Sequence, residues 1–114
     1  MDQAEMSQLI TTYNEYLAKL ASVVEHICED LEAKDFRESP PALPAFLEGL
    51  EWVTEAADGL VGVGKVEATN YQSLLDLIKT LGEAMENRDY ALLRDLLDYE
   101  FQPLLPKLEA NQIN

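Results

Sequence analysis

Residues 10–31 read ITTYNEYLAKLASVVEHICEDL, and apolar residues recur within this stretch at alternating spacings of three and four. This spacing keeps one stripe of an α-helix apolar over about three heptads, as in a coiled coil or a helical bundle. The stripe consists of Ile10, Tyr13, Leu17, Leu20, Val24, Ile27 and Leu31. The sequence therefore predicts a long first helix over residues 3–34.

A second helix is predicted over residues 44–59. It follows a connection at residues 35–44, which contains three prolines that a helix interior cannot accommodate. Pro44 suits the first helical position, and the glycine cluster that begins at Gly59 is expected to end the helix. The apolar stripe of this helix consists of Phe46, Leu50, Val53, Ala57 and Leu60.

A third helix is predicted over residues 70–87. Thr69 and Gln72 have the spacing of a capping box, in which each side chain satisfies a backbone N–H at the helix start. Asn87 is tolerated in a left-handed C-cap and is expected to end the helix. The stripe consists of Tyr71, Leu74, Leu75, Ile78, Leu81 and Met85.

A fourth helix is predicted over residues 89–109, after a turn too short to carry the chain away from the third helix. Pro103 removes a backbone donor, so a kink or a fresh helical start is expected near Tyr99. The stripe consists of Leu93, Leu96, Leu97, Phe101, Leu104, Leu105 and Leu108. The four stripes together predict an all-α fold, an antiparallel up-down four-helix bundle that forms a single domain over residues 1–114.

The first two predicted helices differ in length. At 1.5 Å per residue, the first would span about 48 Å and the second about half of that. An overhanging part of the first stripe would expose apolar side chains, which a two-fold dimer would bury. A homodimer is therefore one expectation, and the alternative is that Phe36, Leu43 and the proline segment fold back over the overhang.

Charge is the strongest feature of the composition, because 22 acidic against 8 basic residues give a formal net charge of −14. The resulting field repels phosphate backbones and anionic membranes, so we expect no nucleic-acid partner and no membrane partner. Basic partners are favoured instead. The N-terminus lacks the features of a secretory signal, and the single cysteine, Cys28, cannot form an internal disulfide, so a cytoplasmic location is expected.

Residues 59–66, GLVGVGKV, match the spacing of a phosphate-binding loop through Lys65. Such a loop needs Ser or Thr after the lysine to bind magnesium, and it needs a preceding strand. Val66 stands in that position, and an amphipathic helix precedes the motif. An interhelical glycine loop accounts better for these residues, and we expect no cofactor.

His26 has the spacing of a metal ligand with Glu29 or Asp30, because residues three or four apart share a helix face. A di-iron carboxylate bundle needs a histidine from each of two helices, whereas this chain has one histidine. His26 and Cys28 point in divergent directions and so cannot form a nucleophilic dyad. We therefore predict no metal-binding residue and no catalytic residue, and hence a protein that is not an enzyme.

Aromatic residues at the edges of the stripes are the candidate partner-binding residues. Trp52 lies beside the second stripe with Gly49 and Ala56 as its three- and four-residue neighbours, which leaves its ring room to project. Tyr16 and Tyr99 lie at the edges of the first and fourth stripes. Because exposed Trp and Tyr are enriched in interface hot spots, these three residues mark a candidate partner surface. The alternative is that Trp52 seals the edge of the core.

The sequence favours a protein-binding module that holds an amphipathic helix of its partner in an apolar groove. In size, charge and architecture, the chain resembles the small acidic helical chaperones and adaptors that bacteria use in flagellar export and secretion, although no sequence motif carries this likeness. Two alternatives stay open. A DNA-mimic inhibitor would array its acidic residues along one elongated outer ridge, and a metal-binding or enzymatic bundle, the less favoured, would point them inward.

Overall fold

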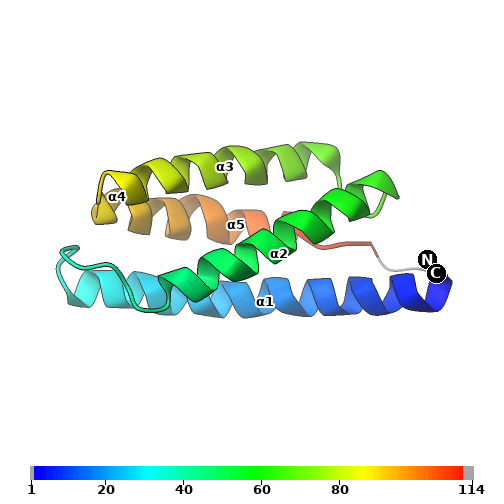
Figure 1. Cartoon of the computed structure of the whole chain (residues 1–114), viewed down its shortest axis with the longest axis horizontal. Helices are drawn as coiled ribbons and strands as arrows, with labels where there is room; N and C mark the ends of the chain where they lie inside the picture. The colour runs from blue at the N-terminus through cyan, green and yellow to red at the C-terminus, as the bar shows by residue number, and fades with distance from the viewer. Residues whose placement is uncertain (1, 112–114) are drawn as a thin grey trace.

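The computed structural model describes residues 2–111, which form four helical rods joined in sequence (Figure 1). The first three rods are α1 (Gln3–Ala33), α2 (Leu43–Gly62) and α3 (Ala68–Glu86). The fourth rod contains α4 (Tyr90–Asp95), a π-helix (Leu96–Phe101), α5 (Gln102–Leu104) and a final 3₁₀ turn (Leu105–Leu108). Helices account for 81% of the described residues, which contain no strand. Residue 1 and residues 112–114 of the predicted domain lie outside the described part of the chain.

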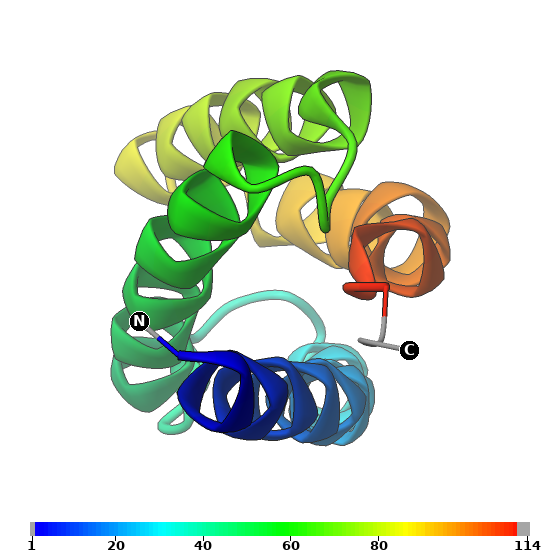
Figure 2. The same ribbon diagram turned by 90° about the vertical axis from the view of Figure 1, so that its right-hand side faces the viewer.

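Successive rods run in opposite directions along the long axis, so the predicted all-α, up-down four-helix bundle is confirmed. The course of α2 is diagonal, because it begins beside α1 and ends beside α3 (Figure 1). In the end-on view of Figure 2, α1 and α3 lie on opposite sides, and α2 and the fourth rod form the other two. The bundle measures 48 × 21 × 19 Å. The 31 residues of α1 span about 46 Å, so α1 runs along nearly the whole molecule.

The core is formed by the predicted apolar stripes. Every member of the first, second and fourth stripes is buried, and Phe46 and Phe101 meet edge to face with their ring centroids 5.5 Å apart. The prediction of the third stripe is wrong in part. Its buried residues are Leu74, Leu77, Leu81 and Ala84, whereas Tyr71, Leu75, Ile78 and Met85 are only partly buried. The reason is that α3 turns Leu77 toward the fourth rod and leaves Leu75 and Ile78 on the side that faces α2.

The long α1 is covered by other parts of the same chain at its C-terminal end and around Tyr13. At its C-terminal end, Phe36 is partly buried and Leu43 is buried, as the fold-back alternative predicts. Toward the N-terminus, Tyr13 Oη donates to the carbonyl of Leu108 (2.9 Å). The side-chain amide of Asn14 pairs with both backbone groups of Ala110 (2.8 and 3.1 Å). The C-terminal end of α1 is thus covered, whereas residues 3–9 at its N-terminal end include no buried residue, and the homodimer stays a prediction.

The ends of α2 and α3 are set by left-handed residues in hydrogen-bonded Schellman motifs. After α2, the left-handed residue is Gly64 (φ 75°), so the helix continues past its predicted end at Gly59 to Gly62. After α3, the predicted left-handed cap at Asn87 is wrong. Asn87 is right-handed (φ −83°), and Arg88 is the left-handed residue (φ 52°).

The predicted capping box at the start of α3 is also wrong. The helix begins at Ala68 after Glu67, and no side-chain hydrogen bond caps it. Thr69 lies inside the first turn, where its carbonyl accepts a hydrogen bond from Ser73 Oγ (3.1 Å). Gln72 donates instead to a carboxylate in the next turn (3.0 Å). Both members of the predicted pair therefore lie within the helix, and neither side chain caps its start.

The interruption predicted near Tyr99 is the π-helix over Leu96–Phe101. At its end, the N–H of Gln102 donates to the carbonyl of Leu97, five residues back instead of four. Pro103 has no N–H, and in a regular α-helix its ring would clash with the carbonyl of Tyr99, four residues earlier. The wider π turn accommodates this proline. The fourth rod therefore stays continuous, although its backbone hydrogen bonds change locally from the α to the π pattern.

Candidate protein-binding surface

A long groove follows the seam between α1 and α2. Because α2 diverges from α1 toward its own C-terminal end, it does not cover the N-terminal half of α1 (Figure 1). Two adjoining hollows of about 500 and 260 Å³ lie along this seam, and a third of about 480 Å³ continues along α1 and is lined by α1 residues alone. Neighbouring hollows share Thr12 or Tyr16 as a boundary. We call them together the α1–α2 groove. It runs along α1 from Ala4 to Val23, a length of about 28 Å at 1.5 Å per residue.

Tyr16 and Trp52 lie together in the middle hollow of this groove. Their rings meet edge to face, with centroids 5.4 Å apart and an interplanar angle of 61°. Trp52 is 38% exposed and presents aromatic surface to the solvent, whereas Tyr16 is half-buried and packs against the core. Two of the three aromatic residues predicted from the sequence are therefore neighbours in space, although they come from different helices.

Gly49 makes room for this aromatic pair. A Cβ atom at position 49 would overlap Tyr16 Oη and press on the end of the tyrosine ring, so the ring lies where any other residue would place a side chain. The sequence shows Gly49 only as a neighbour of Trp52 on the same helix face. The role of Gly49 could not be read from that pattern, because it depends on a tyrosine from another helix.

Tyr99 lies apart from this pair. It is 65% exposed and covers the guanidinium group of Arg94, whose Cζ atom is 5.3 Å from the centre of the tyrosine ring. Arg94 also pairs with Glu32 of α1 (2.8 Å), with Asp95 (3.2 Å) and with Asp98 (3.5 Å). The fourth rod and α2 lie on opposite sides of the bundle (Figure 2). Tyr99 therefore belongs to a charged cluster that joins the fourth rod to α1, and it is not part of the α1–α2 groove.

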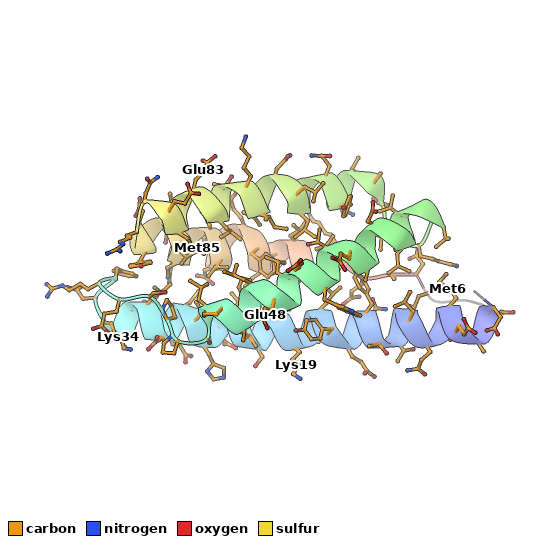
Figure 3. The ribbon with its side chains drawn as sticks, in the orientation of Figure 1. Met6, Lys19, Lys34, Glu48, Glu83 and Met85 are labelled. Carbon is orange, nitrogen blue, oxygen red and sulfur yellow. The ribbon has the colours of Figure 1, made fainter. Side chains whose placement is uncertain are left out.

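One side of the groove is acidic. α2 contains four acidic residues and no basic residue. All four are exposed and recur at spacings of three and four, so they form one line along the helix, the acidic ridge: Glu48, Glu51, Glu55 and Asp58. Within residues 2–111 none of them forms an ion pair. In Figure 3, Glu48 lies on α2 beside the groove. Lys19 of α1 lines the hollow at the Val23 end of the groove.

The histidine and the cysteine do not form a reactive site. His26 is exposed and lies 3.8 Å from Glu29, one turn along α1. Cys28 is buried, and its Sγ atom approaches the carbonyl of Arg94 (3.9 Å). Burial, with a further contribution from Asp98, raises the pKa of the Cys28 thiol to about 11. The thiol is therefore protonated at neutral pH and packs as a small apolar side chain.

The position of the carboxylates bears on the two alternative functions. No Asp or Glu among residues 2–111 is buried, and no group of three or more metal-ligating side chains occurs among them. The inward carboxylates that a metal-binding bundle requires are thus not found in the described chain. The acidic ridge of α2 is an outer ridge, but it extends over only about 15 Å of the 48 Å bundle.

Within the described residues, no helix combines the length and the apolar character needed to cross a bilayer. Comparison with known proteins gives a family model, described as Domain of unknown function (DUF8042), that matches residues 8–111. The match covers the whole bundle except the first turn of α1. No curated protein and no solved structure matches the chain. The chain therefore belongs to the family Domain of unknown function (DUF8042).

Proposed function

We propose that this protein is a non-enzymatic protein-binding module, an adaptor or chaperone that holds an amphipathic helix of a cytoplasmic partner in the α1–α2 groove. The observation that supports this most directly is the exposed Tyr16–Trp52 pair at the centre of an elongated groove. A length of about 28 Å along α1 suits a partner helix of about five turns. Trp and Tyr at the centre of a patch are the residues that most often dominate binding energy.

The chemistry of the groove indicates the kind of partner. Leu9, Tyr16 and Trp52 offer apolar contact area, and Glu5 and Glu48 add negative charge at its borders. The protein as a whole has a net charge of −14, which attracts basic segments and speeds their association at low salt. The favoured occupant is therefore a helix with one apolar face and lysine or arginine at the sides of that face.

The experiment combines partner capture with a variant of the anchor. Wild-type protein and Trp52→Ala are used side by side to capture and titrate partners, and Leu92→Ala is the control because Leu92 is an equally exposed residue (41%) on the fourth rod. We expect Trp52→Ala to weaken binding by about 1–2 kcal/mol or more while Leu92→Ala does not. A partner that binds both variants as well as wild type would contradict the proposal.

Fluorescence gives a second reading of the same residue. Trp52 is the one tryptophan of the chain, so its emission reports the groove alone. In the free protein acrylamide should quench Trp52, and a bound partner should shield it and shift its emission to the blue. Resistance to quenching in the free protein, together with unfolding of Trp52→Ala, would assign Trp52 to the core.

The DNA-mimic alternative is supported by the acidic ridge of α2. It predicts that binding depends on charge more than on the aromatic pair, so Trp52→Ala would have little effect and binding would weaken steeply as salt is raised. The proposal that Trp52 anchors a partner helix predicts the opposite: Trp52→Ala has the larger effect on binding, and salt has the smaller one. The same titrations, repeated at two salt concentrations, therefore distinguish the two functions.

A further inference from the structure

The diagonal course of α2 leaves a second groove on the other side of the acidic ridge, between α2 and α3 (Figure 1). This α2–α3 groove has a volume of about 290 Å³ and is lined chiefly by Leu47, Glu51, Thr54, Glu55, Leu75 and Ile78. It shares no lining residue with the α1–α2 groove. The two grooves are therefore separate places at which another molecule can dock.

The floor of the α2–α3 groove is apolar. Leu47 is 37% exposed, and Leu75 and Ile78 are two of the four members of the predicted third stripe that are only partly buried. The hydroxyl of Thr54 already donates to the carbonyl of Leu50 (2.7 Å), so it does not need a hydrogen bond from a ligand. What the groove offers is aliphatic surface that the bundle itself leaves partly uncovered.

The border of this groove is negatively charged. Glu51 and Glu55 line it from the ridge of α2, and neither forms an ion pair within residues 2–111. Lys79, the basic residue of α3, is not among the lining residues. α2 contributes four acidic residues and no basic one, and α3 contributes three acidic residues and one basic one. A second copy of the chain would bring the same excess of negative charge against this border.

We propose that the α2–α3 groove is a second docking site, for a segment of another protein that inserts aliphatic side chains and flanks them with lysine or arginine. The aliphatic side chains cover Leu75 and Ile78, and the basic groups meet Glu51 and Glu55. The site is independent of the function proposed above, because neither Tyr16 nor Trp52 takes part in it. Two such grooves on either side of one ridge allow the module to hold two segments at once.

Isoleucine methyl groups provide a direct probe of this site. Ile78 lines the groove, whereas Ile10 and Ile27 are buried in the core and serve as internal references. Methyl-labelled protein is titrated with a synthetic helical peptide that has leucines on one face and lysines on the other. The control is an isomer of the same composition whose leucines are scattered around the helix. We expect a saturable shift of the Ile78 methyl with the first peptide only.

Charge-reversal variants test the border without altering the floor. We expect Glu51→Lys with Glu55→Lys to weaken binding of the leucine–lysine peptide about tenfold, as judged by the Ile78 shift. Glu25→Lys with Glu29→Lys makes the same change in net charge at exposed positions of α1 and should have an effect of about twofold or less. Trp52→Phe should leave the Ile78 shift unchanged, which separates this proposal from the anchor proposal.

Any one of four results would overturn the proposal. The first three are that the Ile78 methyl does not shift, that the scattered isomer shifts it equally, and that both charge-reversal pairs weaken binding to the same extent. The fourth is an Ile78 shift that depends on protein concentration without peptide and accompanies dimer formation in sedimentation experiments. That result would assign the groove to a second copy of the chain.

Discussion

Gly49 is the residue on which the position of the Tyr16 ring depends. In an exposed helix, alanine is more stable than glycine by about 1 kcal/mol, because glycine loses more backbone freedom on folding. At position 49 this gain is opposed by the overlap of the new Cβ atom with Tyr16 Oη. The two effects can be separated, because the overlap disappears when Tyr16 is removed.

The prediction for Gly49 is therefore a coupling free energy between the substitutions Gly49→Ala and Tyr16→Ala. Gly49→Ala should stabilise the Tyr16→Ala variant by about 0.5–1 kcal/mol, and it should stabilise wild type by less or destabilise it. A double-mutant cycle measured by urea unfolding gives the difference, which we expect to be about 1 kcal/mol. Equal effects of Gly49→Ala in both backgrounds would show that the tyrosine does not occupy the space at residue 49.

Tyr13 and Cys28 predict how stability depends on high pH. Burial raises the pKa of Tyr13 from 10.0 to about 12, and burial with Asp98 raises the pKa of Cys28 from 9.0 to about 11. Because the folded protein favours the neutral forms of these two groups, their contribution to the free energy of unfolding should be constant below about pH 9 and fall between about pH 9 and pH 12. Each group contributes up to about 3 kcal/mol to this loss, at about 1.4 kcal/mol per pKa unit.

Urea unfolding at about pH 8 and about pH 11 measures this loss. Tyr13→Phe should reduce the difference in the free energy of unfolding between the two pH values, because it removes the buried phenol that titrates. The substitution at Tyr13 also removes the hydrogen bond to the carbonyl of Leu108, which lowers stability equally at both pH values. A profile that keeps its full slope in Tyr13→Phe would contradict the prediction.

At the scale of the helix, two glycines near the C-terminal end of α2 should respond oppositely to the same substitution. Gly59 lies within α2 with nothing near its missing side chain, so Gly59→Ala should stabilise the protein by about 0.5–1 kcal/mol. Gly64 has a left-handed backbone (φ 75°), so Gly64→Ala should destabilise it by about 1–2 kcal/mol. Thermal melts of the two variants test the assignment, and effects of the same sign would show that α2 ends elsewhere.

The sequence predicts the helices better than it predicts their ends or the grooves. Apolar spacing identifies the buried residues of three stripes, because burial along a helix follows its period directly. The helix ends differ because Arg88 and Gly64, and not Asn87 and Gly59, adopt the left-handed backbone. The grooves could not be predicted, because they result from the diagonal course of α2, which depends on packing between rods and has no signature within one segment.

At the scale of the whole molecule, the net charge of −14 predicts how stability depends on salt. The exposed carboxylates repel one another, and raising sodium chloride from about 10 mM to about 150 mM shortens the screening length from about 30 Å to about 8 Å. If repulsion decreases by about 1 kcal/mol, the melting temperature of a domain of this size should rise by about 4 °C. A lower melting temperature at the higher salt would show that ion pairs such as Arg94 with Glu32 outweigh the repulsion.

The hydrogen bonds between α1 and residues 108–110 have a consequence for the chain during its synthesis. Tyr13 and Leu108 lie 95 positions apart, and Asn14 and Ala110 lie 96 apart. At about 5–20 residues per second, a ribosome needs about 5–20 s to reach Leu108 and Ala110 after it has added Tyr13 and Asn14. During this time the apolar stripe near Tyr13 lacks its final cover. The protein, which we propose binds helices of its partners, is thus expected to need another protein to cover the apolar stripe of its own first helix during synthesis.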